Sequence, residues 1–153
     1  MIKKIIKFYT SLGFGKTIEN SEEIDKKYKR LRWSVFISAT IGYSLFYVCR
    51  LSLSVVKKPI VDSGILSDSE LGMIGSALFF AYAIGKLTNG FLADRSNIKR
   101  FMATGLLLTA LINLALGFST SFTAFIILWG FSGWFQSMGA APSVVSLSRW
   151  FSN

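Results

Sequence analysis

Two cations, Arg50 and Lys86, lie inside long apolar segments of this sequence. A charge at membrane depth costs about 2.5–3.5 kcal/mol on insertion scales, so such residues usually face the interior of a helix bundle and have a function there. Neither segment contains an Asp or Glu that would neutralise the cation. We therefore expect the missing negative charge to come from a ligand, and an anion such as a phosphate ester is the first hypothesis.

The spacing of the polar residues around Arg50 supports this hypothesis. Tyr43, Tyr47 and Arg50 are spaced i, i+4 and i+7, which places all three on one face of a helix. A guanidinium forms bidentate hydrogen bonds with phosphate oxygens, whereas the ammonium of Lys86 supplies a compact second charge. Because a phosphate monoester carries about −1.5 to −2 charges near neutral pH, the two cations would roughly balance it.

The alternative is that both cations reach the membrane surface. Arg50 lies six residues before the outer end of its segment, and Lys86 lies seven residues before the inner end. A long side chain at such a position can extend to the lipid headgroups. The residues alone leave both interpretations open.

Composition indicates a membrane protein. Hydrophobic residues make up 52% of the 153 residues, 14 of them Phe, and the mean hydropathy is +0.49. A soluble domain of this size has too little interior to bury so much apolar surface, so a lipid bilayer is expected to cover the rest. One cysteine, Cys49, and no histidine exclude an internal disulfide and make a soft-metal site improbable, so no metal or cofactor is expected.

Four apolar segments predict an all-α membrane protein with four transmembrane helices. Each segment is long enough to cross a hydrocarbon core of about 30 Å, and lipid offers no partners for backbone groups. A basic segment, residues 1–32, precedes these spans. Its first 14 residues form either an amphipathic helix on the inner leaflet or a frayed tail. Gly13, Gly15 and Glu19–Asp25 are expected to form a linker within the segment. The expected spans are residues 33–56, 71–93, 101–118 and 122–148, with Lys57–Glu70 and Ser119–Ser121 among the connections.

The distribution of charge predicts the orientation of these helices. The net charge is +9, and nine of the 17 Lys and Arg residues precede the first span. With the N-terminus in the cytoplasm, thirteen cations flank the inner ends of the spans and two, Lys57 and Lys58, lie outside. This placement is typical of membrane flanks rather than of a nucleic-acid groove, so no nucleic-acid partner is expected.

The fourth segment is rich in small residues, among them Gly130, Gly133 and Gly139, and it contains Pro142. Small residues allow a neighbouring helix backbone to come close. A proline weakens the helix locally, so this segment either bends during function or packs tightly as an ordinary bundle helix.

The connection between the second and third spans, Gly90–Arg100, carries a recognisable pattern. It resembles the loop G-x-x-x-D-R-x-G-R-R between helices two and three of the major facilitator superfamily. Asn97 stands where most members have Gly. The resemblance implies a loop that gates conformational exchange and binds no substrate, with Gly90, Asp94, Arg95 and Arg100 in that role.

Further residues resemble the organophosphate:phosphate antiporters within that superfamily. They are Gly42–Arg50, Lys86, the Asn variant of the loop, and Gly133–Gln136 followed by Gly139. The resemblance implies that Arg50 grips the phosphate, that Lys86, Tyr43 and Tyr47 line the pocket, and that Gln136 is a polar cavity residue. Two departures, Leu51 after Arg50 and Ala140 in place of a bulky aromatic residue, leave the substrate open.

The resemblance implies the first third of a twelve-helix fold in a bacterial inner membrane, so we expect a truncated N-terminal portion of a transporter. The expected function is exchange of organophosphates, such as a sugar phosphate or glycerol-3-phosphate, for inorganic phosphate. The alternative is a non-transporting sensor of external hexose phosphate that acts through a partner membrane kinase. A complete four-span oligomer of the small multidrug exporter kind is disfavoured because no acid lies inside a span. No nucleophile, base and orienting group occur at a spacing that would make an enzyme.

Overall fold

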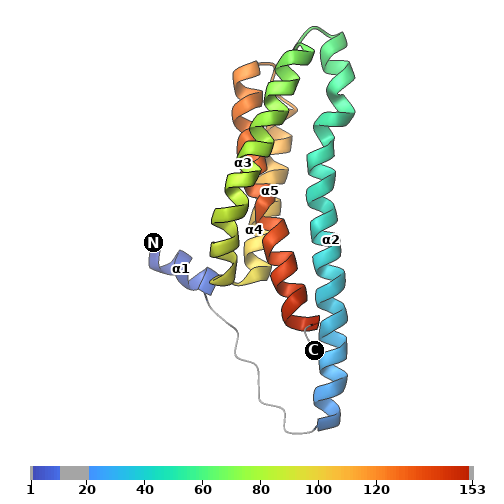
Figure 1. Ribbon diagram of the computed structural model, residues 1–153, viewed down its shortest axis with the longest axis vertical. Helices are drawn as coiled ribbons and strands as arrows, with labels where there is room; N and C mark the ends of the chain where they lie inside the picture. Colours follow the sequence, from blue (N-terminus) through green and yellow to red (C-terminus); the bar gives the residue numbers. More distant parts are fainter. Residues whose placement is uncertain (1, 11–20, 152–153) are drawn as a thin grey trace.

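A computed structural model describes residues 2–10 and 21–151 of the chain, and these residues contain helices and no strand. A short helix is followed by a bundle of four long ones that run alternately up and down (Figure 1). The all-α class predicted from composition is confirmed. The helices are α1 (Ile2–Thr10), α2 (Ser21–Asp62), α3 (Asp68–Asp94), α4 (Ile98–Leu116) and α5 (Phe122–Phe151).

Helix α2 is much longer than its apolar part. It contains 42 residues, begins twelve residues before the apolar segment and continues through Pro59 to Asp62. The predicted linker over Glu19–Asp25 is therefore wrong from Ser21 onwards, and the α2–α3 connection starts only after Asp62, not at Lys57. Acidic residues in the first turn and a run of Lys and Arg, which are good helix formers, explain the extension. Gly13 and Gly15 of the predicted linker lie outside the described residues.

Three helices, α2, α3 and α4, are long and apolar enough to span a membrane. Helix α5 has 30 residues, which is a sufficient length, and it carries polar residues such as Gln136 and Ser137. These polar residues are buried in the bundle rather than turned outward. The exact span limits stay predictions.

Local signals fix the ends of α3 and α4. Ser67 caps α3 in a complete capping box, in which its hydroxyl accepts from the Glu70 N–H and its own N–H donates to the Glu70 carboxylate at 2.7 Å. Gly64 in the preceding turn has φ +70°, a conformation that favours glycine. Asn97, which departs from the superfamily loop pattern, caps α4 by accepting from the N–H of Arg100.

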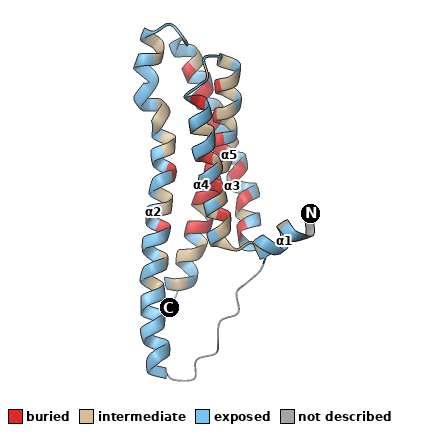
Figure 2. Ribbon diagram, turned by 180° about the vertical axis from the view of Figure 1, so that it is seen from behind, coloured by how far each residue is buried: buried red, intermediate tan, exposed pale blue. Residues whose placement is uncertain are grey.

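The core lies between α3 and α5. Figure 2 shows the buried residues concentrated in α3, α4 and α5, while α2 is exposed along most of its length. A Cβ at Gly133 would lie 3.0 Å from the carbonyl carbon of Leu78, and one at Gly139 would lie 2.5 Å from the Phe46 ring. These two glycines of the fourth predicted span therefore serve close packing, whereas Gly130 has open space around it.

Helix α1 lies against the turn between α3 and α4. The N–H of Asn97 donates to the Tyr9 carbonyl at 2.6 Å, the Arg100 guanidinium donates to the Phe8 carbonyl, and the Tyr9 hydroxyl lies 2.8 Å from Thr104 Oγ1. Residues 2–10 thus form a helix, as the first of the two alternatives requires, and the position of this helix on the inner leaflet stays a prediction. This helix is held at the same end of the bundle as the predicted gating loop.

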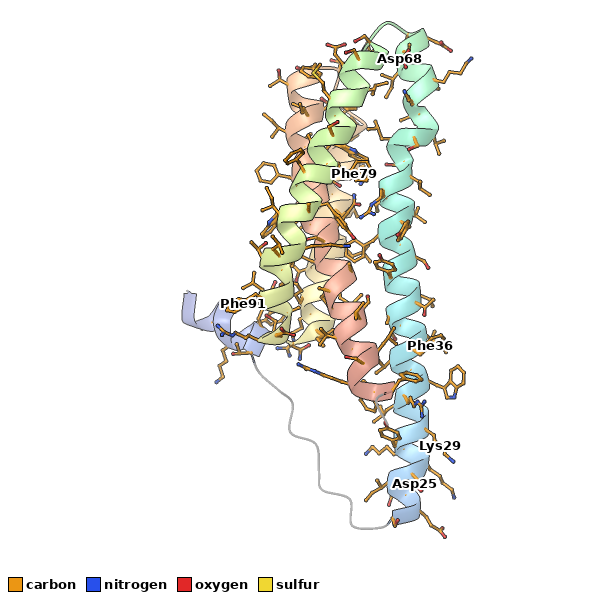
Figure 3. The ribbon with its side chains drawn as sticks, in the orientation of Figure 1. Asp25, Lys29, Phe36, Asp68, Phe79 and Phe91 are labelled. Carbon is orange, nitrogen blue, oxygen red and sulfur yellow. The ribbon has the colours of Figure 1, made fainter. Side chains whose placement is uncertain are left out.

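The charged extension of α2 packs on the end of α5. Tyr28 stacks on Trp150 with ring centroids 5.5 Å apart and donates to its carbonyl at 2.9 Å. Phe36 contacts Phe151 about two turns further along α2, and Asp25 and Lys29 project from the extension (Figure 3). The extension and the bundle are therefore joined by an aromatic contact.

Candidate anion-binding site

Arg50 connects three helices. From α2, its Nε donates a 2.8 Å hydrogen bond to Oε1 of Gln136 on α5. Its guanidinium carbon lies 4.3 Å from the ring centroid of Tyr82 on α3 and 5.2 Å from that of Tyr47 on α2. The side chain is directed at the neighbouring helices, and its charge is held by aromatic faces and an amide oxygen.

No acid compensates this charge. Among the described residues the one ion pair joins Lys57 to Asp68, and no carboxylate lies within ion-pair distance of Arg50 or Lys86. Within the same part of the chain, Nε is the only nitrogen of Arg50 that donates a hydrogen bond. Both terminal nitrogens therefore remain available for a bidentate contact with an anion.

Gln136 is fixed from its other side. Its side chain is 1% exposed, and its Nε2 donates a 2.9 Å hydrogen bond to Ser132 Oγ, one turn earlier on α5. With the amide nitrogen engaged by Ser132, the amide oxygen faces Arg50. A buried amide with both ends bonded holds the guanidinium in one orientation.

Tyr82 is the site residue that the sequence analysis missed. Its ring contacts Arg50, and the Lys86 Nζ lies 5.0 Å from its centroid. Tyr82 precedes Lys86 by four residues, so the two share one face of α3. That spacing was the available signal, but Tyr82 follows Phe79 and Phe80, which are exposed and indistinguishable from it by type.

Of the predicted residues, Arg50, Tyr47 and Gln136 are brought together, and Tyr43 joins them through Tyr47. The rings of Tyr43 and Tyr47 are 5.2 Å apart at an angle of 77°. Lys86 is exposed and reaches this group only through the ring of Tyr82. Its part in the pocket stays a prediction.

A cavity of about 250 Å³ opens beside Arg50. It lies between α2 and α3. Helix α2 packs mainly on α5 and α4, so few of its residues fill the space next to α3. Small-molecule pockets usually begin at about 300 Å³, so this volume lies just below the usual range. Its lining residues include Arg50, Ser54 and Lys57 of α2, Phe79 of α3 and Trp129 of α5.

The predicted gating residues lie apart from this group, at the α3–α4 turn. Asp94 is the last residue of α3, and the Arg95 guanidinium stacks 4.1 Å above the Phe91 ring. A Cβ at Gly90 would lie 4.0 Å from that of Ala141, which is ordinary contact. Gly90 thus faces α5, but the space around it would accept a residue with a side chain.

Comparisons with known proteins identify the family of this chain. Residues 32–153 match the Major Facilitator Superfamily. The chain is 38% identical over 95% of its length to a probable hexose phosphate transport protein of Chlamydia pneumoniae, covering 32% of that protein. It is 36% identical over 88% of its length to the membrane sensor protein UhpC of Salmonella typhimurium, covering 30% of it.

A glycerol-3-phosphate transporter of Haemophilus influenzae is 37% identical over 86% of the chain, which covers 28% of that protein. The chain thus spans about a third of the length of these curated relatives. No solved structure gives a significant match. The resemblance predicted from the loop and the polar residues is confirmed: this multi-pass membrane chain belongs to the major facilitator superfamily, and its relatives include organophosphate transporters and a sensor.

Proposed function

We propose that the chain supplies the phosphate-gripping part of an organophosphate transporter that exchanges its substrate for inorganic phosphate. The observation that carries the proposal is Arg50, which is oriented by Gln136 and has no acidic partner among the described residues. The relatives named as hexose phosphate and glycerol-3-phosphate transporters support the same ligand class.

Binding in this proposal is electrostatic and reversible. The two terminal nitrogens of Arg50 form a fork that matches two phosphate oxygens, and the tyrosine rings limit its movement. Lys86 adds the second positive charge. In this proposal Arg50, Lys86 and the tyrosines bind the substrate without reacting with it, so the substrate passes through chemically unchanged.

Transport itself needs the two six-helix halves of the superfamily, which rock around a site near the bilayer midplane. In this scheme Gly90, Asp94, Arg95 and Arg100 belong to the gate at the α3–α4 turn. The excess of Lys and Arg at that end of the bundle supports a cytoplasmic location for it and for the N-terminus, in a bacterial inner membrane.

The test is exchange by the full-length protein in liposomes loaded with inorganic phosphate. We expect Arg50→Lys to abolish phosphate-dependent uptake of labelled hexose phosphate, because an ammonium cannot form the bidentate contact. Insertion into the membrane should be normal. Arg30→Lys is the control, since it makes the same change at an exposed position of α2. Unchanged exchange in Arg50→Lys would remove Arg50 from the pocket.

A sensor of external hexose phosphate is the second candidate function. The similarity to UhpC favours it. Both functions would use the same anion pocket. Ligand-dependent signalling through a membrane kinase without net uptake by the full-length protein would identify the sensor.

A further inference from the structure

Lys57 shares the cavity with Arg50. Both side chains line it from the same helix, seven residues apart, which is about two turns or roughly 10 Å along α2. Lys57 lies at the end of the cavity nearest the α2–α3 connection. Arg50 and Lys57 thus line the same cavity at two successive positions along α2.

Asp68, the first residue of α3, binds Lys57. Its Oδ1 lies 3.4 Å from the Lys57 Nζ. The side chains are 52% and 75% exposed, and ion pairs of such exposure stabilise proteins by only about 0.2–1 kcal/mol. This pair is therefore easily broken, and another anion can take the place of the carboxylate.

We propose that Lys57 is an entry site for the anionic substrate and that Asp68 competes with the substrate for it. The inference rests on the proposed function and adds the route by which the phosphate reaches Arg50. A phosphate monoester carries about twice the charge of a carboxylate, so it attracts Lys57 more strongly than Asp68 does. Lys57 releases Asp68 when the substrate arrives and passes the substrate on to Arg50.

Two substitutions that break the same ion pair separate this role from a structural one. Lys57→Gln removes the cation, whereas Asp68→Asn leaves the cation and removes its competitor. If the pair only held α2 against α3, both variants would change uptake in the same direction. If Lys57 attracts the substrate, the variants act in opposite directions.

The measurement is the half-saturating concentration of external hexose phosphate for uptake by intact cells that produce the full-length protein. We expect Lys57→Gln to raise this concentration about two- to fivefold, and Asp68→Asn to lower it about twofold, as a single exposed charge allows. The double variant should behave like Lys57→Gln. Both effects should fade as the ionic strength rises from about 0.01 M to 1 M, because salt screens exposed charges.

Lys58→Gln is the matched control, since it removes an adjacent exposed cation of the same helix that neither lines the cavity nor pairs with Asp68. Equal effects of Lys57→Gln and Lys58→Gln would overturn the inference, as would changes of the same sign in Lys57→Gln and Asp68→Asn. A wild-type protein without phosphate-dependent uptake would instead overturn the proposed function.

Discussion

Gly133 is a position at which α3 and α5 approach each other closely, and its substitution tests the packing of the bundle. A Cβ there would lie 3.0 Å and 3.1 Å from the carbonyl carbon and Cα of Leu78 and would come still closer to the carbonyl oxygen. Ordinary contact begins at 3.4 Å, and the obstacle is backbone, which cannot rotate away. We therefore expect Gly133→Ala to push the two helices apart at an overpacking cost of about 1–3 kcal/mol.

The control is Gly130→Ala, three residues earlier on α5, where a Cβ would meet nothing within 4 Å. Both substitutions gain the same helix propensity, about 0.8–1 kcal/mol, so the difference between them isolates the clash. Thermal unfolding of the purified protein in detergent micelles measures it. At roughly 2–4 °C per kcal/mol, Gly133→Ala should melt several degrees below Gly130→Ala. Equal melting temperatures would refute the close approach of α3 and α5.

Two further predictions concern the site and the start of α3. Gln136→Leu removes the acceptor of Arg50 Nε; since hydrogen bonds to charged groups contribute about 1.5–3 kcal/mol, a phosphate-ester titration should show roughly ten- to hundredfold weaker binding. Unchanged affinity would mean that Gln136 does not orient Arg50. Backbone and side-chain hydrogen bonds from Ser67 hold the pKa of Glu70 below its usual value, so the capping box is fully formed above the usual pKa and is lost as pH falls through the lowered one. Amide exchange in the first turn of α3, corrected for intrinsic rates, should therefore accelerate on acidification in the wild type. Glu70→Gln should show no such acceleration, and acceleration in both would contradict the assignment.

The position of Arg50 was predictable from the sequence, because a charged residue in an apolar segment without an acid can lie in few places. It either faces the interior of the bundle or reaches the membrane surface. The length of the apolar segments identified the helix class, and the i, i+4, i+7 spacing identified the face shared by Tyr43, Tyr47 and Arg50. Gln136 was found by resemblance, but its bond to Ser132 follows an i, i+4 spacing that pattern analysis can detect.

Other features depend on contacts between distant segments. Tyr82 looks like its aromatic neighbours until the structure places it beside Arg50, a residue of another helix. The bond from Asn97 to the Tyr9 carbonyl joins residues almost ninety positions apart, and no local pattern encodes it. The extension of α2 was missed for a different reason. Glu19–Asp25 was interpreted as a linker before a basic cluster, although Glu, Lys and Arg are all good helix formers.

Helix α2 buries only Ala39 and Phe46 among its 42 residues, and the Phe46 ring sits against Gly139. This contact can act as a fulcrum. Arg50 lies one turn from it, about 6 Å along the axis, whereas Ser21 lies about 37 Å away on the other arm. A 10° tilt about Phe46 would displace Arg50 by about 1 Å and the start of the helix by about 6 Å. Such a tilt would thus leave the guanidinium nearly stationary but would strain the contact between Tyr28 and Trp150.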